Sequence, residues 1–105
     1  KAINYTYFMD EILEKKGLDE LCKLVAQTDD VNLLSDFFEC LFTPSELKDF
    51  SKRWLIVKEI AKGTPQRDIA EKFHMSLCKI TRGSKELKKK DSAFRIMLER
   101  AAQFD

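Results

Sequence analysis

The chain has little of what turns, sheets and disordered segments are made from. Its 105 residues include only three glycines and two prolines, while 44% are hydrophobic and 35% are charged. This composition excludes a disordered or collagen-like chain, and no segment shows the sustained two-residue alternation of a half-buried strand. We therefore predict an all-α protein, either a single domain over residues 1–105 or a protomer that completes its core with a partner.

Metal-binding patterns are also scarce. The three cysteines form no CxxC motif and His74 is the only histidine, which argues against a structural zinc site. His74 and Cys78 are four residues apart, but a turn is expected between them and no third ligand is near. We expect no metal, and we expect reduced thiols that fill apolar positions in a reducing compartment.

Membrane-spanning and catalytic patterns are missing as well. No apolar run approaches the roughly 18 residues that a membrane span needs, and no charged-then-apolar leader opens the sequence. We therefore expect a cytoplasmic protein with no membrane partner. No Ser-His-Asp set, paired carboxylates or glycine-rich phosphate loop stands out, so we do not expect an enzyme.

What the chain does have is charge that is unevenly placed. Residues 1–44 hold four bases and nine acids, and residues 45–105 hold fifteen bases and nine acids, although the net charge is only +1. Residues 62–90 alone hold nine bases and three acids. A basic centre indicates an anionic partner; the alternative is a solvated basic face without a partner.

Apolar spacing and capping residues predict six helices, over roughly residues 3–27, 31–41, 44–62, 65–73, 77–90 and from 92 onward. Asp29 and Asp30 are suited to cap the second helix, Thr43 the third, Ser76 the fifth, and Asp91 or Ser92 the last. Gly63 is suited to end the third, and Gly17 is expected to weaken or bend the first. The last helix is expected to bury Phe94, Met97, Leu98 and Ala101.

Apolar surface is abundant for a chain of this length. Five large aromatic residues lie between positions 37 and 54, and several helices are apolar over more than one face. A two-fold dimer with a shared core hides such surface better than a monomer does, so we predict a homodimer. In the third helix one apolar stripe is expected, made of Leu47, Phe50, Trp54, Val57 and Ala61.

Residues 66–88 have the pattern of a helix-turn-helix. Ala70 is small enough for two short helices to cross closely. The turn of this motif usually needs one residue with positive φ, most often glycine; here it is His74, which tolerates positive φ better than a branched residue does. The wedge between the helices is expected to be filled by Ile69, Phe73, Met75 and Ile80.

This motif predicts DNA binding. Its second helix would lie in the major groove, and Arg67 on the first helix would present a guanidinium that matches the two groove acceptors of guanine. An ordinary helical hairpin is the alternative, but the basic charge is concentrated here and the exposed positions are short or hydrogen-bonding. The residues expected to meet DNA are Arg67, Ser76, Leu77, Cys78, Lys79, Thr81, Ser84 and Lys88.

A series of motifs closely resembles the bacterial tryptophan repressor family. They include Leu-Phe-Thr-Pro-Ser-Glu at 41–46, Gln-Arg-Asp-Ile-Ala-Glu-Lys at 66–72 and Ile-Thr-Arg-Gly-Ser at 80–84. The resemblance implies an intertwined homodimer with six helices per chain that represses genes of tryptophan biosynthesis or uptake. It also implies L-tryptophan as corepressor, with one molecule bound per protomer beneath the helix-turn-helix.

The same resemblance implies a site for the indole and the carboxylate. Arg53 and Arg82 would sandwich the ring, Arg82 would also meet the carboxylate, and Gly83 would leave room for the ring. Guanidinium groups suit both tasks, because they stack on aromatic faces and pair with carboxylates. Without the resemblance, a pair of surface salt bridges is the simpler interpretation of the two arginines.

Two arrangements for the ligand ammonium stay open. The resemblance implies Thr43 together with the backbone carbonyls of Cys40 and Phe42 of the partner subunit. The chain, however, has Glu86 where the family usually has a small hydroxyl residue. Its carboxylate either binds the ammonium directly or lies in solvent beside one of the lysines that follow it.

Two further departures from the family bear on function. The link from Gly63 to Gln66 is one residue shorter than in familiar members, which would re-aim the helix pair, and Leu47 stands where an arginine is usual. Two alternative functions therefore stay open. One is the same DNA-binding fold with another amino acid or indole compound as effector; the other is a helix-pair module that binds another protein.

Overall fold

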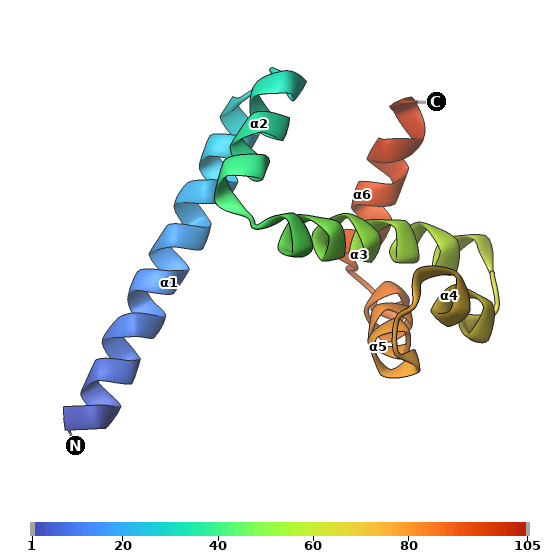
Figure 1. Ribbon diagram of the computed structural model, residues 1–105, viewed down its shortest axis with the longest axis horizontal. Helices are drawn as coiled ribbons and strands as arrows, with labels where there is room; N and C mark the ends of the chain where they lie inside the picture. The colour runs from blue at the N-terminus through green and yellow to red at the C-terminus, as the bar shows by residue number, and fades with distance from the viewer. Residues whose placement is uncertain (1, 105) are drawn as a thin grey trace. The chain divides into compact units, whose positions relative to one another are not determined.

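The computed structural model describes residues 2–104, with side chains from residue 7 onward. Within this range the chain forms six α-helices, one short 3₁₀ helix and no strand, which confirms the all-α prediction (Figure 1). The elements are α1 (Ala2–Gln27), α2 (Val31–Leu41), α3 (Pro44–Lys62), α4 (Gln66–Phe73), α5 (Leu77–Lys88), α6 (Ala93–Ala101) and η1 (Ala102–Phe104).

The helix ends lie where the capping residues predict them, with small differences. An oxygen of Asp30 accepts a hydrogen bond from the Leu33 amide at 3.1 Å, and Gly63 ends α3 with φ of +88°. One expectation is corrected, because α5 ends at Lys88, two residues early. α1 continues through Gly17 without a break, and the expected weakening at this glycine stays a prediction.

The chain divides into two compact units, one ending at Thr43 and one starting at Pro44. In the first, α1 and α2 together line an apolar pocket of about 210 Å³. Much apolar surface of this unit is nevertheless uncovered, and no residue of α2 is fully buried. Its exposed apolar side chains include Tyr7, Phe8, Leu13, Leu18, Leu24, Val31, Leu33 and Leu41.

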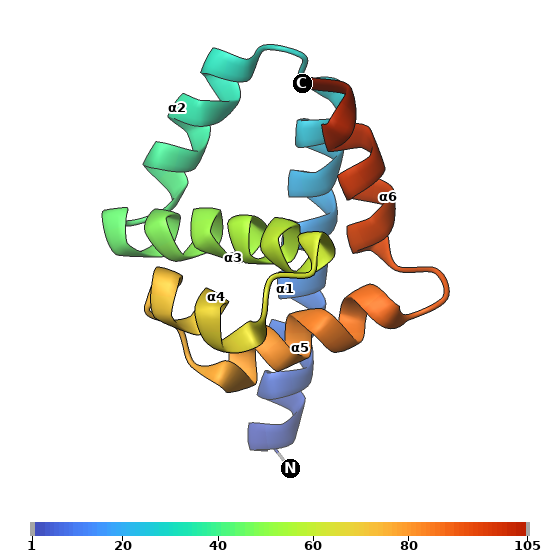
Figure 2. The ribbon, with the colours of Figure 1, turned by 90° about the vertical axis from the view of Figure 1, so that its right-hand side faces the viewer.

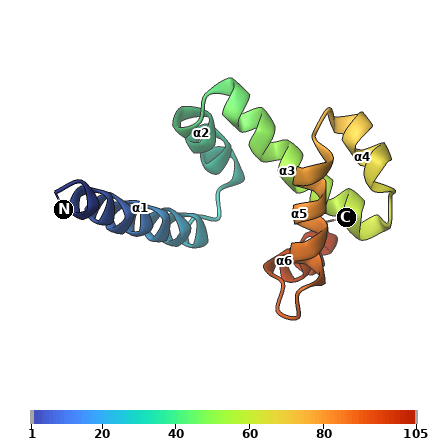
Figure 3. The ribbon, with the colours of Figure 1, turned by 90° about the horizontal axis from the view of Figure 1, so that it is seen from below.

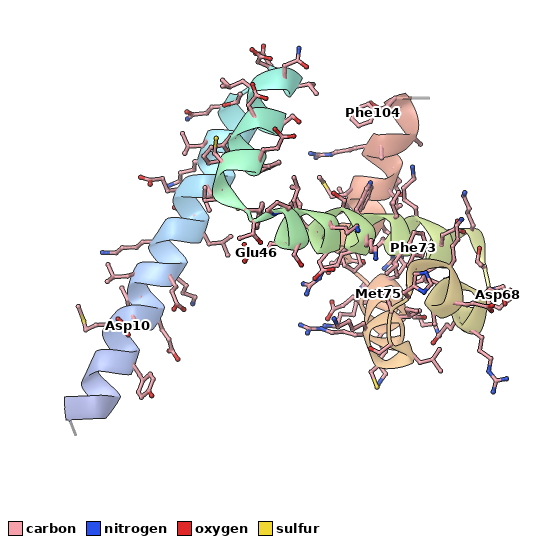
Figure 4. All side chains as sticks on the ribbon, viewed as in Figure 1. Asp10, Glu46, Asp68, Phe73, Met75 and Phe104 are labelled. Carbon is pink, nitrogen blue, oxygen red and sulfur yellow. The ribbon has the colours of Figure 1, made fainter. Side chains whose placement is uncertain are left out.

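The second unit has its core where three helices meet. α3 lies across α4 and α5 (Figures 2 and 3), and Ile56, Ile69 and Ile80, one from each helix, are buried together. Phe73 and Met75 lie where α4 and α5 come together beside α3 (Figure 4), so the predicted wedge is confirmed. Ile60 and Ala70 are also packed against this core.

The packing corrects two predictions about buried faces. In α3 Val57 of the predicted stripe is buried as expected, but Ile56 outside the stripe is buried too, and Phe50 of the stripe is 47% exposed. In α6 no residue is fully buried and Met97 is 53% exposed. Within its unit the nine-residue helix packs on α5, and its Phe94 faces the side chains of Ile56 and Val57 on α3 across a pocket.

The turn between α4 and α5 has the predicted geometry. His74 has φ of 54° and ψ of 46°, the left-handed region, and no other described residue except glycine has a positive φ. The Met75 amide then donates to the Ala70 carbonyl at 3.1 Å, which closes the turn tightly. α5 begins directly after it, where the Ser76 hydroxyl accepts from the Lys79 amide at 3.4 Å.

Candidate nucleic-acid interface and ligand pocket

The α4–turn–α5 pair, residues 66–88, presents most of the predicted DNA-binding residues to solvent. Arg67 is exposed on α4, and Leu77, Cys78 and Lys79 are exposed in the first turn of α5. Ser76 and Lys88 are exposed at the two ends of α5, while Thr81 and Ser84 are half-buried. The pair therefore offers a largely polar and basic surface that also includes Leu77 and Cys78, while Ile69 and Ile80 are turned to the core.

Thr81 is tied to the other helix of the pair. Its hydroxyl donates a hydrogen bond to the side-chain oxygen of Gln66, at the start of α4, over 3.0 Å. This bond connects α4 and α5 at the surface. The sequence alone predicted Thr81 as a DNA contact and missed Gln66, because fifteen residues separate the two.

A second tie connects α3 to α4 across the short link. One oxygen of Glu59 accepts from the Lys72 ammonium at 2.9 Å, and the other accepts from the Thr64 hydroxyl at 2.8 Å. The side chain of Glu59 is only 15% exposed. These bonds to Lys72 and to Thr64 lower the pKa of the Glu59 carboxyl. One carboxylate thus connects the Gly63–Gln66 link and α4 to α3.

This geometry predicts a pH-dependent contribution of Glu59 to stability. Because its folded-state pKa is lowered, the carboxylate stabilises the fold above its usual pKa of 4.5, and this stabilisation is lost as pH falls through the lowered value. Glu59→Gln should therefore lower the melting temperature at neutral pH, and the difference from the unaltered protein should disappear in acid. Thermal unfolding followed by circular dichroism measures it. The control is Glu71→Gln, which alters an exposed acid on α4. A difference in melting temperature between Glu59→Gln and the unaltered protein that persists unchanged at acid pH would contradict this role.

A pocket of about 450 Å³ lies in the second unit, between α3, α5 and the start of α6. Pockets of this size accommodate small-molecule ligands. Its apolar wall comes from Ile56, Val57, Met75 and Phe94, and its charged residues are Arg53, Lys79, Arg82 and Glu86. Gly83 completes the lining.

The pocket brings together four residues that the sequence singled out as ligand-binding: Arg53, Arg82, Gly83 and Glu86. It also contains residues that the sequence did not assign to it. Lys79 was assigned to DNA alone, and Phe94 was expected only as a buried residue of the last helix; no pattern in the sequence marks either as a pocket residue. Cys40, Phe42 and Thr43 belong to the first unit, and their role stays a prediction.

The two arginines are not in salt bridges. Among the side chains that the structure describes, those of residues 7–104, neither the Arg53 nor the Arg82 guanidinium has a hydrogen bond or an ion pair. Both side chains are exposed at the pocket. The simpler interpretation as paired surface charges is therefore wrong for the protomer, and the two cations can meet an anion or an aromatic face.

Gly83 has a packing role in addition to lining the pocket. A Cβ atom at this position would lie 3.2 Å from the Cδ1 of Ile60, which is tighter than ordinary van der Waals contact. The absent side chain therefore lets α5 approach α3 closely. The separation of these two helices sets the width of the pocket between Arg53 and Arg82.

Glu86 lies on the pocket wall and also makes an ion pair. Its Oε1 accepts from the Lys89 ammonium at 2.9 Å, and the two side chains are 43% and 65% exposed. Such exposed pairs contribute about 0–1 kcal/mol. The structure thus shows the neighbouring lysine, while direct binding of the ligand ammonium by Glu86 stays a prediction. Among the described residues, no cluster of His, Cys, Asp and Glu suited to a metal ion is found.

Comparisons with known proteins match this part of the chain. A family model described as Trp repressor protein matches residues 16–102, which include every pocket-lining residue. A Trp operon repressor homolog of Chlamydia trachomatis serovar D is 34% identical over 88 residues, 83% of this chain and 94% of the relative. Homologs of the same name from Chlamydia caviae and Xylella fastidiosa strain M23 are 33% and 32% identical, covering 81% and 70% of this chain and 85% and 80% of the relatives. No solved structure matches the chain.

Proposed function

The chain belongs to the Trp repressor family, and on this basis we propose that it represses genes of tryptophan biosynthesis or uptake by binding operator DNA when L-tryptophan is bound. The family is regulatory and not enzymatic, so the chain is not an enzyme. Three relatives carry the name Trp operon repressor homolog, which supports tryptophan genes as the targets.

One observation carries this proposal: the pocket shares a wall with the DNA-facing helix. Lys79 lies in the first turn of α5, among the exposed residues assigned to DNA, and it also lines the pocket. Arg82 and Gly83 follow it one turn later on the same side of the helix. A ligand in the pocket therefore contacts the helix that would enter the major groove.

The pocket suits the chemistry of L-tryptophan. Arg53 on α3 and Arg82 on α5 supply two guanidinium groups without protein partners in the described chain. Stacking on an indole would contribute about 0.5–2 kcal/mol for each of them, and Arg82 would also pair with the carboxylate. The ammonium would be held by Thr43 with backbone carbonyls of Cys40 and Phe42 of the partner subunit.

The switch would be a shift between conformations. With ligand between α3 and α5, the two α5 helices of a dimer would be held about 34 Å apart, the spacing of successive major grooves. Without the ligand, the two α5 helices would move inward or loosen, and they could no longer enter two successive major grooves at the same time. Because operator DNA is the proposed partner, we place this activity in the cytoplasm. None of the helices described between residues 2 and 104 could span a membrane.

The uncovered apolar surface of α1 and α2 predicts a homodimer. Leu13, Leu18 and Val31 are 60%, 63% and 77% exposed, and exposure of this extent usually marks an interface. Light scattering at micromolar concentration should give twice the 12.3 kDa of one chain. A mass near that of one chain across the concentration range would contradict the prediction.

Operator binding in the presence and absence of L-tryptophan, measured by fluorescence anisotropy, tests the proposed function. Operator binding that needs L-tryptophan supports the proposed function. Operator binding that responds instead to another amino acid or indole compound would identify that compound as the effector. A salt series separates both from a protein-interaction module, because phosphate contacts release counterions and helix docking does not.

Lys88 at the end of α5 is expected to meet phosphate, not a base. Lys88→Ala should therefore weaken binding to operator and random DNA by similar factors, and lower the slope of log affinity against log salt by about one. Anisotropy titrations over a range of salt concentrations measure both quantities. Selective loss of operator binding would instead show that Lys88 reads sequence.

A further inference from the structure

The charges of the pocket are ordered along α5. Lys79, Arg82 and Glu86 all line the pocket and stand at positions i, i+3 and i+7, so they follow one another along a single face of the helix. Two cations therefore come first and one carboxylate follows, about a turn beyond Arg82. Arg53 on α3 adds a third cation to the same pocket.

Glu86 is the sole carboxylate among the described residues that line this pocket. With the three cations alone, any aromatic compound bearing a carboxylate would be attracted. A carboxylate on the wall repels a second anion and attracts a cation at short range. Ligands that carry both charges are then favoured over ligands that carry only the negative one.

We propose that Glu86 makes the pocket specific for a zwitterion: its carboxylate binds the ligand's ammonium and discriminates against aromatic carboxylic acids that lack an amine. The inference rests on the proposed function, which makes this pocket the ligand site. It assigns the ammonium to the protomer that holds the ring, in addition to any contact from the partner subunit.

Lys89 acts as the competitor of the ligand's ammonium. Its ammonium is 2.9 Å from the Oε1 of Glu86, and its side chain is 65% exposed, so this pair is weak and easily exchanged. An amine that enters the pocket replaces Lys89 at the carboxylate, and Lys89 returns to solvent. A ligand without an amine leaves the pair intact and gains nothing from it.

Calorimetric titrations of the protein with L-tryptophan and with indole-3-propionate test the inference. Glu86→Gln keeps the shape of the side chain and removes its charge. This substitution should lower the affinity for L-tryptophan about 10-fold to 100-fold, the range for a lost charge-assisted hydrogen bond. The affinity for indole-3-propionate should stay unchanged or rise several-fold. Glu99→Gln, an exposed acid on α6 outside the pocket lining, is the matched control and should change neither affinity.

Lys89→Gln supplies an independent arm, since it leaves the pocket lining untouched. Removal of the competing ammonium should raise the affinity for L-tryptophan by a few-fold and leave the affinity for indole-3-propionate unchanged. Equal effects of Glu86→Gln on both ligands, or no effect on either, would overturn the role of Glu86 while keeping the ligand site. Failure of the unaltered protein to bind either ligand would overturn the proposed function itself.

Discussion

Arg82→Ala is expected to weaken L-tryptophan binding by about 2–5 kcal/mol, because one substitution removes the stacked guanidinium and the partner of the carboxylate. The remaining carboxylate would then lie in the pocket without its cation. Arg53→Ala should cost less, about 0.5–2 kcal/mol, since it removes stacking alone. Isothermal titration calorimetry distinguishes the two variants directly.

The structure provides a control for this prediction. Among the described side chains of residues 7–104 the Arg82 guanidinium has no hydrogen bond or ion pair, so its loss should leave the melting temperature of the ligand-free protein nearly unchanged. Lys85→Ala removes a neighbouring exposed cation of α5 that does not line the pocket, and should leave affinity unchanged. Equal losses in the Arg82 and Lys85 variants would mean that only net charge matters and that Arg82 makes no specific contact.

Local features of the chain were predictable because local rules fix them. His74 stands where the tight turn between α4 and α5 demands a positive φ, and the structure has φ of 54° there. Ile69 and Ile80 are both fully buried, as their spacing around the turn predicts. Such features depend on residues within a few positions of one another, which a sequence displays directly.

The buried face of α3 was harder to predict, because this helix is apolar on more than one side. Ile56 and Ile60 pack on the core of the second unit, whereas Phe50 stays 47% exposed in the protomer. Helical periodicity shows which residues share a face but not which neighbour each face meets. The predicted stripe therefore includes Val57, which is buried, but it also includes Phe50, which the protomer leaves largely uncovered.

Contacts between distant residues were also out of reach. The bond from Thr81 to Gln66 and the one from Lys72 to Glu59 join positions fifteen and thirteen residues apart. Lys79 has the residue type expected of a DNA contact, so nothing marked it as a pocket residue as well. These ties determine how α4, α5 and the pocket are held together, and they depend on the crossing of three helices.

Arg67→Ala should lower specific operator affinity by about 1–3 kcal/mol and leave L-tryptophan binding intact, because the exposed arginine on α4 is outside the pocket lining. Arg67→Lys keeps the charge but loses the two-pronged guanidinium. It should therefore retain binding to random DNA while losing preference for guanine at one operator position. Anisotropy titrations separate these effects when they compare the operator, an operator whose guanine at that position is replaced by another base, and random DNA. Full rescue by lysine would show that Arg67 meets phosphate alone, and a matching loss of tryptophan affinity would show that α4 is not the reading element assigned here.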